Sequence, residues 1–147
     1  MRLAPVLVGM TIAALTATAA AEDVTFRYIV DNSPLDVTPK PGEVLTQEVL
    51  EFRTTGQNPY KGKAEAVAKG KAIYEEYCAS CHMPDGSGHM GPSLIEDGHI
   101  HDEIKTDVGM FSIVFGGGMG AMQPFSKRLT QDEILKAMAY VRTLMKP

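Results

Sequence analysis

The sequence has 147 residues, with 14 lysines and arginines against 18 aspartates and glutamates, 44% hydrophobic residues and two cysteines. This length suits a single globular domain, and 14 glycines and nine prolines without a fixed period exclude collagen-like and low-complexity chains. The formal net charge of −4 argues against a nucleic-acid partner, and two cysteines are too few for a disulfide-rich scaffold.

Residues 1–21 are typical of a secretory signal peptide. Arg2 is the only charged residue among them, a broken apolar stretch follows it, and small residues at Ala19 and Ala21 fit an A-x-A cleavage site. The apolar stretch is shorter than the roughly 20 residues that cross a bilayer, so we expect no membrane span after cleavage. Export of this kind predicts a location in the periplasm. An uncleaved N-terminal anchor is the alternative.

Residues 22–62 are expected to form an N-terminal extension that packs on the following domain instead of folding alone. Residues 24–30 have β character, and the segments 31–34 and 39–42 contain turn signals. Residues 46–54 can form a short helix.

The alanine-rich segment 63–77 predicts a helix. Val67, Gly70, Tyr74 and Tyr77 recur at the spacing of one helical face. Because glycine weakens a helix, Gly70 indicates a close contact with a second helix.

The segment Cys78-Ala79-Ser80-Cys81-His82 is a C-x-x-C-H motif, the attachment signal of c-type haem. Two thiols on one helical turn can reach both vinyl groups of one porphyrin, and His82 then lies under the iron as an axial ligand. A thioredoxin-like pair, a zinc site and a plain disulfide are the alternatives. The first lacks a βαβ pattern, the second lacks two further ligands, and the third leaves His82 unexplained. The motif therefore predicts one covalently bound haem c.

The segment 83–101 is expected to form a loop along the haem edge. It contains His89 and the H-x-H pair of His99 and His101. On a strand this pair could share a face and bind a metal, but histidines in a surface loop are the simpler interpretation.

Two further helices are predicted by their start signals. Thr106 can cap a helix over 106–115. Thr130 and Glu133 form a T-x-x-E capping box at the start of a helix over 130–145. The apolar stripe of this last helix consists of Ile134, Met138, Val141 and Met145.

Electron transfer by haem requires a sixth iron ligand, and a His/Met pair raises the potential of the iron. The loop 116–125 begins with Gly116, which can end the preceding helix, and it contains Met119 and Met122. Glycine lets a backbone approach the haem face closely, and Pro124 stiffens the end of the loop. Met122 is the predicted ligand and Met119 the alternative. The remaining methionines lie near His82 in sequence or inside predicted helices, and these are Met83, Met90, Met110, Met138 and Met145.

The segment 63–147 resembles class I cytochromes c. The resemblance rests on Gly70-x-x-x-Tyr74, the C-x-x-C-H motif, Gly91-Pro92-Ser93-Leu94, Met122-x-Pro124-Phe125, Leu129-Thr130-x-x-Glu133-Ile134 and Ala139-Tyr140-Val141. It implies an all-α fold around the haem in which the first and last helices cross, with Gly70 against Tyr140. It also implies that the Pro92 carbonyl accepts a hydrogen bond from His82, which would orient the ring.

Three segments are similar to the cytochrome cL family in particular. They are residues 26–35, residues 52–60, which include Thr55-Gly56-Gln57-Asn58-Pro59-Tyr60, and residues 106–117, which begin with Thr106-Asp107-Val108-Gly109. The likeness spans nearly all of the chain after the signal peptide. One departure follows the haem motif, where Met83-Pro84-Asp85 replaces the Gly-His-like residues usual in that family.

This resemblance implies a one-electron carrier, not an enzyme. It would accept electrons from a PQQ-dependent methanol dehydrogenase, including the lanthanide-dependent type, and pass them to a second cytochrome c or a terminal oxidase. Calcium binding is possible, but no ligands can be assigned. A general respiratory carrier, an acceptor in methylamine oxidation, and a haem enzyme or gas sensor stay open as alternatives.

Overall fold

The computed structural model describes residues 24–95 and 102–145. Within them the chain forms α1 (Gln47–Thr55), α2 (Ala64–Tyr77), α3 (Ala79–His82), a 3-10 helix (Asp102–Lys105), α4 (Asp107–Gly116) and α5 (Gln131–Leu144). The predicted signal peptide and the H-x-H histidines lie outside the described residues. In the described part of the chain, no helix combines the length and apolar character that crossing a membrane requires.

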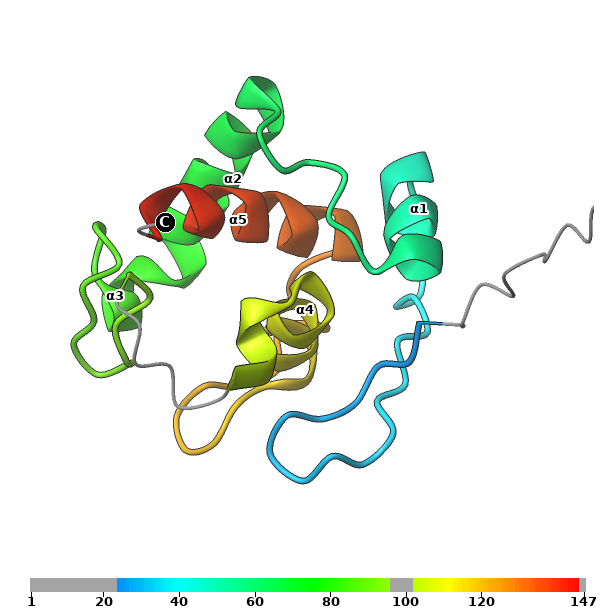
Figure 1. Cartoon of the computed structure of the whole chain (residues 1–147), viewed down its shortest axis with the longest axis horizontal. Helices are drawn as coiled ribbons and strands as arrows, with labels where there is room; N and C mark the ends of the chain where they lie inside the picture. Colours follow the sequence, from blue (N-terminus) through cyan, green and yellow to red (C-terminus); the bar gives the residue numbers. More distant parts are fainter. Residues whose placement is uncertain (1–23, 96–101, 146–147) are drawn as a thin grey trace, which may run out of the picture.

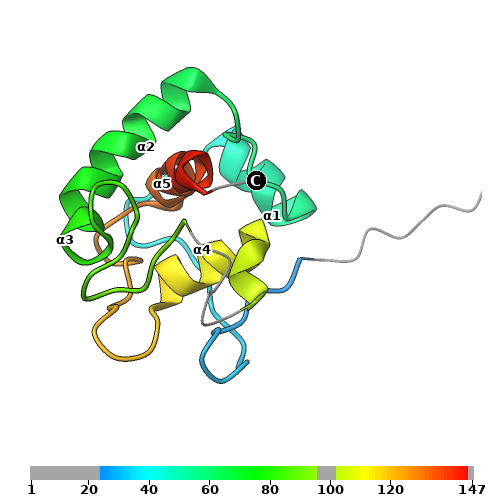
Figure 2. The same cartoon turned by 60° about the vertical axis from the view of Figure 1, so that its left-hand side comes forward.

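Helices α2 and α5 cross each other, and α4 lies against α5 (Figures 1 and 2). A Cβ atom built on Gly70 would lie 1.9 Å from the carbonyl oxygen of Lys136, so the two helix backbones are in contact at this point. The predicted crossing is therefore present, but the atoms nearest to Gly70 belong to the backbone of Lys136 and Ala137 and not to the expected partner Tyr140. Tyr140 packs one helical turn further along, where its ring centroid lies 5.3 Å from that of Tyr74. The backbones are too close at Gly70 for any side chain to enter.

The helix starts follow the local signals. Thr130 and Glu133 form the predicted capping box, and Thr106 accepts a hydrogen bond from the backbone N–H of Gly109. Helix α4 extends one residue further than expected, because its last residue is Gly116 and Gly117 is the residue that ends it. Ile134, Met138 and Val141 of the predicted apolar stripe are buried in α5, whereas Met145 follows the last residue of the helix and is half-buried.

The first described residues form a hairpin-like turn instead of a strand. Its backbone pairing is one isolated bridge between Arg27 and Pro34, because no neighbouring segment in the described part of the chain offers a second edge. The side chain of Phe26 anchors this turn in an aromatic cluster. Its ring centroid lies 5.8 Å from that of Phe52 in α1 and 5.5 Å from that of Phe111 in α4.

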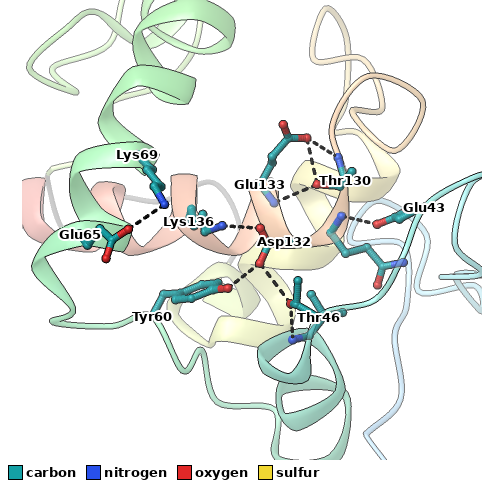
Figure 3. Close-up of polar contacts among 11 residues, drawn as sticks. Glu43, Thr46, Tyr60, Glu65, Lys69, Thr130, Asp132, Glu133 and Lys136 are labelled. Carbon is teal, nitrogen blue, oxygen red and sulfur yellow. Dashed lines mark hydrogen bonds and ion pairs between the residues drawn. The ribbon is translucent and has the colours of Figure 1, made fainter.

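Polar contacts join the extension to the start of α5 (Figure 3). The Asp132 carboxylate accepts hydrogen bonds from the hydroxyls of Thr46 and Tyr60 and pairs with Lys136. The backbone N–H of Gln131 donates to Glu43 at 2.6 Å. Burial raises the pKa of the Asp132 carboxyl, but the hydrogen bonds from Lys136 and Tyr60 outweigh it, and the net result is a lowered pKa.

Candidate haem-binding site

The C-x-x-C-H motif lies where α2 gives way to α3. Cys78 directly follows Tyr77, the last residue of α2, and its carbonyl oxygen accepts hydrogen bonds from the backbone N–H groups of Cys81 and His82 at 3.1 and 2.9 Å. This single tight turn places two thiols and an imidazole on one wall of a cavity. The cavity has a volume of about 270 Å³.

All of the predicted site residues line this cavity. Cys78, Cys81, His82 and Pro92 come from the motif and the loop after it, and Met119 and Met122 come from the loop after α4. The two groups are more than 25 positions apart in the printed sequence, and only the fold brings them together. Val114 and Phe125 add apolar surface between them.

His82 is buried, and its ring is held in one orientation. Its Nδ1 atom lies 2.9 Å from the carbonyl oxygen of Pro92. A carbonyl oxygen can only accept, so Nδ1 carries the proton and Nε2 is the nitrogen that can bind a metal. The contact is the one implied by the resemblance to class I cytochromes c.

Gly91 packs against the imidazole ring of His82, a contact that was not predicted from the sequence. A Cβ atom built on Gly91 would lie 2.6 Å from Cε1 and 2.8 Å from Nδ1 of His82. The backbone at Gly91 therefore lies directly against the His82 ring. The ring occupies the space that a side chain at position 91 would need. The Gly91-Pro92 dipeptide could be identified in the sequence, but its proximity to the His82 ring could not be predicted from it.

Tyr74 is a second residue whose part in the site was not foreseen. It is buried in α2, and its hydroxyl donates a hydrogen bond to the carbonyl oxygen of Met83 at 2.7 Å. Burial, followed by a smaller effect of the nearby Cys78, raises the pKa of Tyr74 to about 12. The protonated hydroxyl therefore ties α2 to the residue directly after His82 over the whole physiological pH range.

The loop after α4, which supplies Met119 and Met122 to the cavity lining, is held by backbone hydrogen bonds at both ends. The backbone N–H of Gly118 donates to the carbonyl oxygen of Met122 at 3.0 Å, and that of Phe125 donates to Val114 at 3.1 Å. Met122 is half-buried in this loop, whereas 62% of the Met119 surface is exposed. Met122 therefore has the more enclosed position on the cavity wall.

The chemistry of these donors fits a covalently attached haem and disfavours the alternatives. Both cysteines lie in the described part of the chain as free thiols. Burial, together with the neighbouring Cys81, raises the pKa of the Cys78 thiol to about 11, whereas redox-active C-x-x-C pairs have lowered thiol pKa values. Among the described residues, no three His, Cys, Asp or Glu side chains form a group suited to a metal ion.

Comparison with known proteins agrees with this geometry. A family model described as "Cytochrome C oxidase, cbb3-type, subunit III" matches residues 65–141. Cytochrome c-L of Methylorubrum extorquens is 34% identical over 146 residues, a match that covers 94% of this chain and 74% of the relative. The chain belongs to the cytochrome cL family.

Two solved cytochrome cL structures have the same fold. The protein of Methylophaga aminisulfidivorans has a TM-score of 0.79 at 33% identity, covering 82% of this chain and 80% of that one. The protein of Hyphomicrobium denitrificans has a TM-score of 0.80 at 35% identity, covering 85% of this chain and 76% of that one. The predicted family and the all-α class I cytochrome c fold are confirmed.

Other relatives match a smaller part of the chain. Cytochrome c6 of Chlorolobion braunii is 31% identical over 77 residues, which is 51% of this chain and 86% of the relative. Cytochromes c of these families bind haem c covalently and carry electrons without being enzymes. Membership of the cytochrome cL family therefore identifies the cofactor as haem c and the class of function as electron transfer.

Proposed function

We propose that this cytochrome cL is a periplasmic carrier that accepts single electrons from a PQQ-dependent methanol dehydrogenase. It then passes them to a second cytochrome c or a terminal oxidase. One observation carries this choice of donor. The match to cytochrome c-L covers 94% of the chain, including the extension before α2, whereas the match to a cytochrome c6 covers 51%. A likeness to cytochrome c-L that extends beyond the haem domain favours the electron donor that this family serves.

The proposed attachment uses the residues that line the cavity. Cys78 and Cys81 would carry the haem through thioethers, and His82 and Met122 would bind its iron, with Met119 as the alternative to Met122. Bound in this way, the haem iron would supply a one-electron Fe(III)/Fe(II) couple. The chain itself holds the imidazole through Pro92 and supplies the Met122 thioether from the loop after α4.

The mouth of the cavity is the proposed transfer surface. The side chains of Met90, Met119 and Gln123 line the cavity and are also exposed. Exposed Glu75 and Glu76 lie at the end of α2, beside the haem motif. This arrangement suits a donor surface with apolar groups at its centre and basic groups near its edge.

The proposal also requires that the chain is exported to the periplasm. We assign residues 1–21 as a signal peptide that is removed before haem attachment, which takes place outside the cytoplasm. The N-terminal sequence of the purified holoprotein tests this assignment, with Glu22 as the expected first residue. An N-terminus at Met1 would indicate an anchor.

The donor is tested by stopped-flow reduction of the oxidised holoprotein with a PQQ methanol dehydrogenase and methanol. The proposal requires fast reduction that saturates with cytochrome concentration, because productive transfer follows formation of a specific complex. A cytochrome c6 serves as the control acceptor. Slow, unsaturable reduction that matches this control would exclude the proposed donor and leave methylamine oxidation or general respiration.

A further inference from the structure

The hairpin-like turn of residues 26–35 lies directly on the last residue of α4. A Cβ atom built on Gly116 would lie 3.0 Å from the ring of Tyr28 and 3.1 Å from Cδ1 of Leu35. The two side chains from the extension thus fill the space that a side chain at position 116 would occupy. Gly116 is also the first residue of the segment that leads to Met122.

The residues at positions 116–118 have no side chains with which to pack. Positions 116–118 are consecutive glycines, and Gly117 has a positive φ of 87°. Such a stretch has a high conformational freedom, which neighbouring groups must restrict if the loop is to hold one position. A Cβ atom built on Gly118 would lie 3.4 Å from Sδ of Met122, so the glycine backbone directly supports the methionine thioether.

The turn itself is firmly held. The backbone N–H of Tyr28 donates to Ser33 at 2.9 Å, and that of Leu35 donates to Phe26 at 3.0 Å. Leu35 is buried, and the Phe26 ring lies in the aromatic cluster with α1 and α4. A well-anchored turn therefore contacts Gly116, the last residue of α4, directly before Gly117 and Gly118.

We infer that Tyr28 and Leu35 are positioning residues for the sixth iron ligand. They restrict the glycine segment and thereby stabilise the closed position of the loop that carries Met122. The inference rests on the proposed ligand set, in which Met122 binds the iron. It gives the extension a role in the haem site although, among the described residues, none from 24–62 lines the cavity.

The test is displacement of the sixth ligand by imidazole in the oxidised holoprotein, followed by the change in absorption. Imidazole can bind only when the loop opens, so its apparent affinity reports the population of the open loop. Tyr28→Ala should raise that affinity about fivefold, a coupling typical of packed neighbours. Tyr28→Phe keeps the ring and should match the unchanged protein.

Val30→Ala is the matched control. Val30 lies in the same turn as Tyr28, and the two side chains have similar exposed fractions of 48% and 37%. Tyr28→Ala and Val30→Ala therefore each remove an apolar side chain from the surface of this turn. Leu35→Val is a second, conservative variant and should raise the affinity by a smaller factor in the same direction. Thermal unfolding of each holoprotein separates loop opening from a general loss of stability.

The outcomes separate the two proposals. Met122→Ala should bind imidazole far more tightly than the unchanged protein, because its site is already open. If it does not, the ligand set fails and the positioning role fails with it. If Met122→Ala behaves as expected but Tyr28→Ala matches Val30→Ala, only the positioning role is overturned.

Discussion

Met83, the residue after the proposed iron ligand His82, has an unusual backbone. Its φ of 64° and ψ of 154° lie in a region that is almost confined to glycine. Three local features maintain it: its N–H donates to Ala79 at 2.9 Å, its carbonyl accepts from Tyr74, and Pro84 favours the extended ψ. The resemblance to cytochrome cL proteins implies Gly-His-like residues in place of Met83-Pro84-Asp85, and a glycine at position 83 would suit such a backbone.

Replacing Met83 with glycine should therefore stabilise the holoprotein by about 1 kcal/mol. The relief of about 1–3 kcal/mol of backbone strain outweighs the entropy that glycine loses on folding. Denaturant unfolding measures the change. Met90→Gly is the control, because Met90 is exposed in the same loop and does not have a positive φ. Equal destabilisation by both substitutions would contradict the presence of strain at Met83.

The choice between the two loop methionines is also a question about single residues. Met122→Ala should abolish the weak red absorption band of methionine bound to Fe(III) and lower the midpoint potential, since a methionine ligand raises it. Met119→Ala should keep both, because the Met119 side chain is mostly exposed. Loss of the band in Met119→Ala alone would reverse the assignment.

The contact between α2 and α5 depends on one glycine. Helix propensity alone predicts that Gly70→Ala would stabilise α2 by about 1 kcal/mol. The structure predicts the opposite, because the new Cβ would lie 1.9 Å from the Lys136 carbonyl oxygen and the two helix backbones would have to separate. We expect Gly70→Ala to destabilise the protein by about 2–3 kcal/mol. Denaturant unfolding of Gly70→Ala measures the sign of the change in the free energy of unfolding. Ala72→Ser, on the exposed face of α2, should change stability by less than about 0.5 kcal/mol.

The junction between the extension and α5 should make stability dependent on acid. The pKa of Asp132 is lowered in the folded protein below its ordinary value of 3.8. Its contribution is therefore complete above that value and is lost as the pH falls through the folded pKa. Asp132→Asn should lower stability at neutral pH by about 1–3 kcal/mol and flatten the loss of stability at low pH.

Thermal unfolding between about pH 2 and pH 7, a range that spans the carboxyl pKa values, measures this dependence. Glu51→Gln is the control, because Glu51 is an exposed carboxylate on α1. A parallel acid profile in Asp132→Asn and the unchanged protein would show that other carboxylates cause the acid sensitivity.

At the scale of the whole molecule, net charge should govern the encounter with the electron donor. The chain carries a formal charge of −4, and removal of residues 1–21 also removes the positive charge of Arg2. A basic docking surface would therefore be attracted over distances comparable to the Debye length, about 10 Å at 0.1 M salt. The second-order rate of reduction by the dehydrogenase should fall about tenfold as salt rises from about 10 mM to about 200 mM.

The same stopped-flow measurement at several ionic strengths checks this prediction. The rate of electron transfer inside the saturated complex should change much less, since steering acts on the encounter. A second-order rate that does not depend on salt would mean that apolar contacts at the cavity mouth, such as those of Met90 and Met119, dominate docking.

Features encoded within about four residues were predictable from the sequence alone. The cap at Thr106 and the capping box at Thr130 act on N–H groups three positions away, and each helix begins where these residues predict. The C-x-x-C-H motif is equally local, because one turn suffices to place Cys78, Cys81 and His82 on one wall. The fold class and the cofactor followed from such local patterns and from the resemblance that they carry.

Contacts between distant segments were decided by the tertiary structure. Gly70 meets the Lys136 backbone and not Tyr140, Gly91 lies against the His82 ring, and Tyr28 covers Gly116. The β character of 24–30 produced a single bridge, since a strand needs a partner that the described fold does not provide. Sequence spacing specifies which groups lie near each other along a helix. Which backbone approaches another depends on the packing of whole elements, and that packing places a turn of the extension behind the loop of Met122.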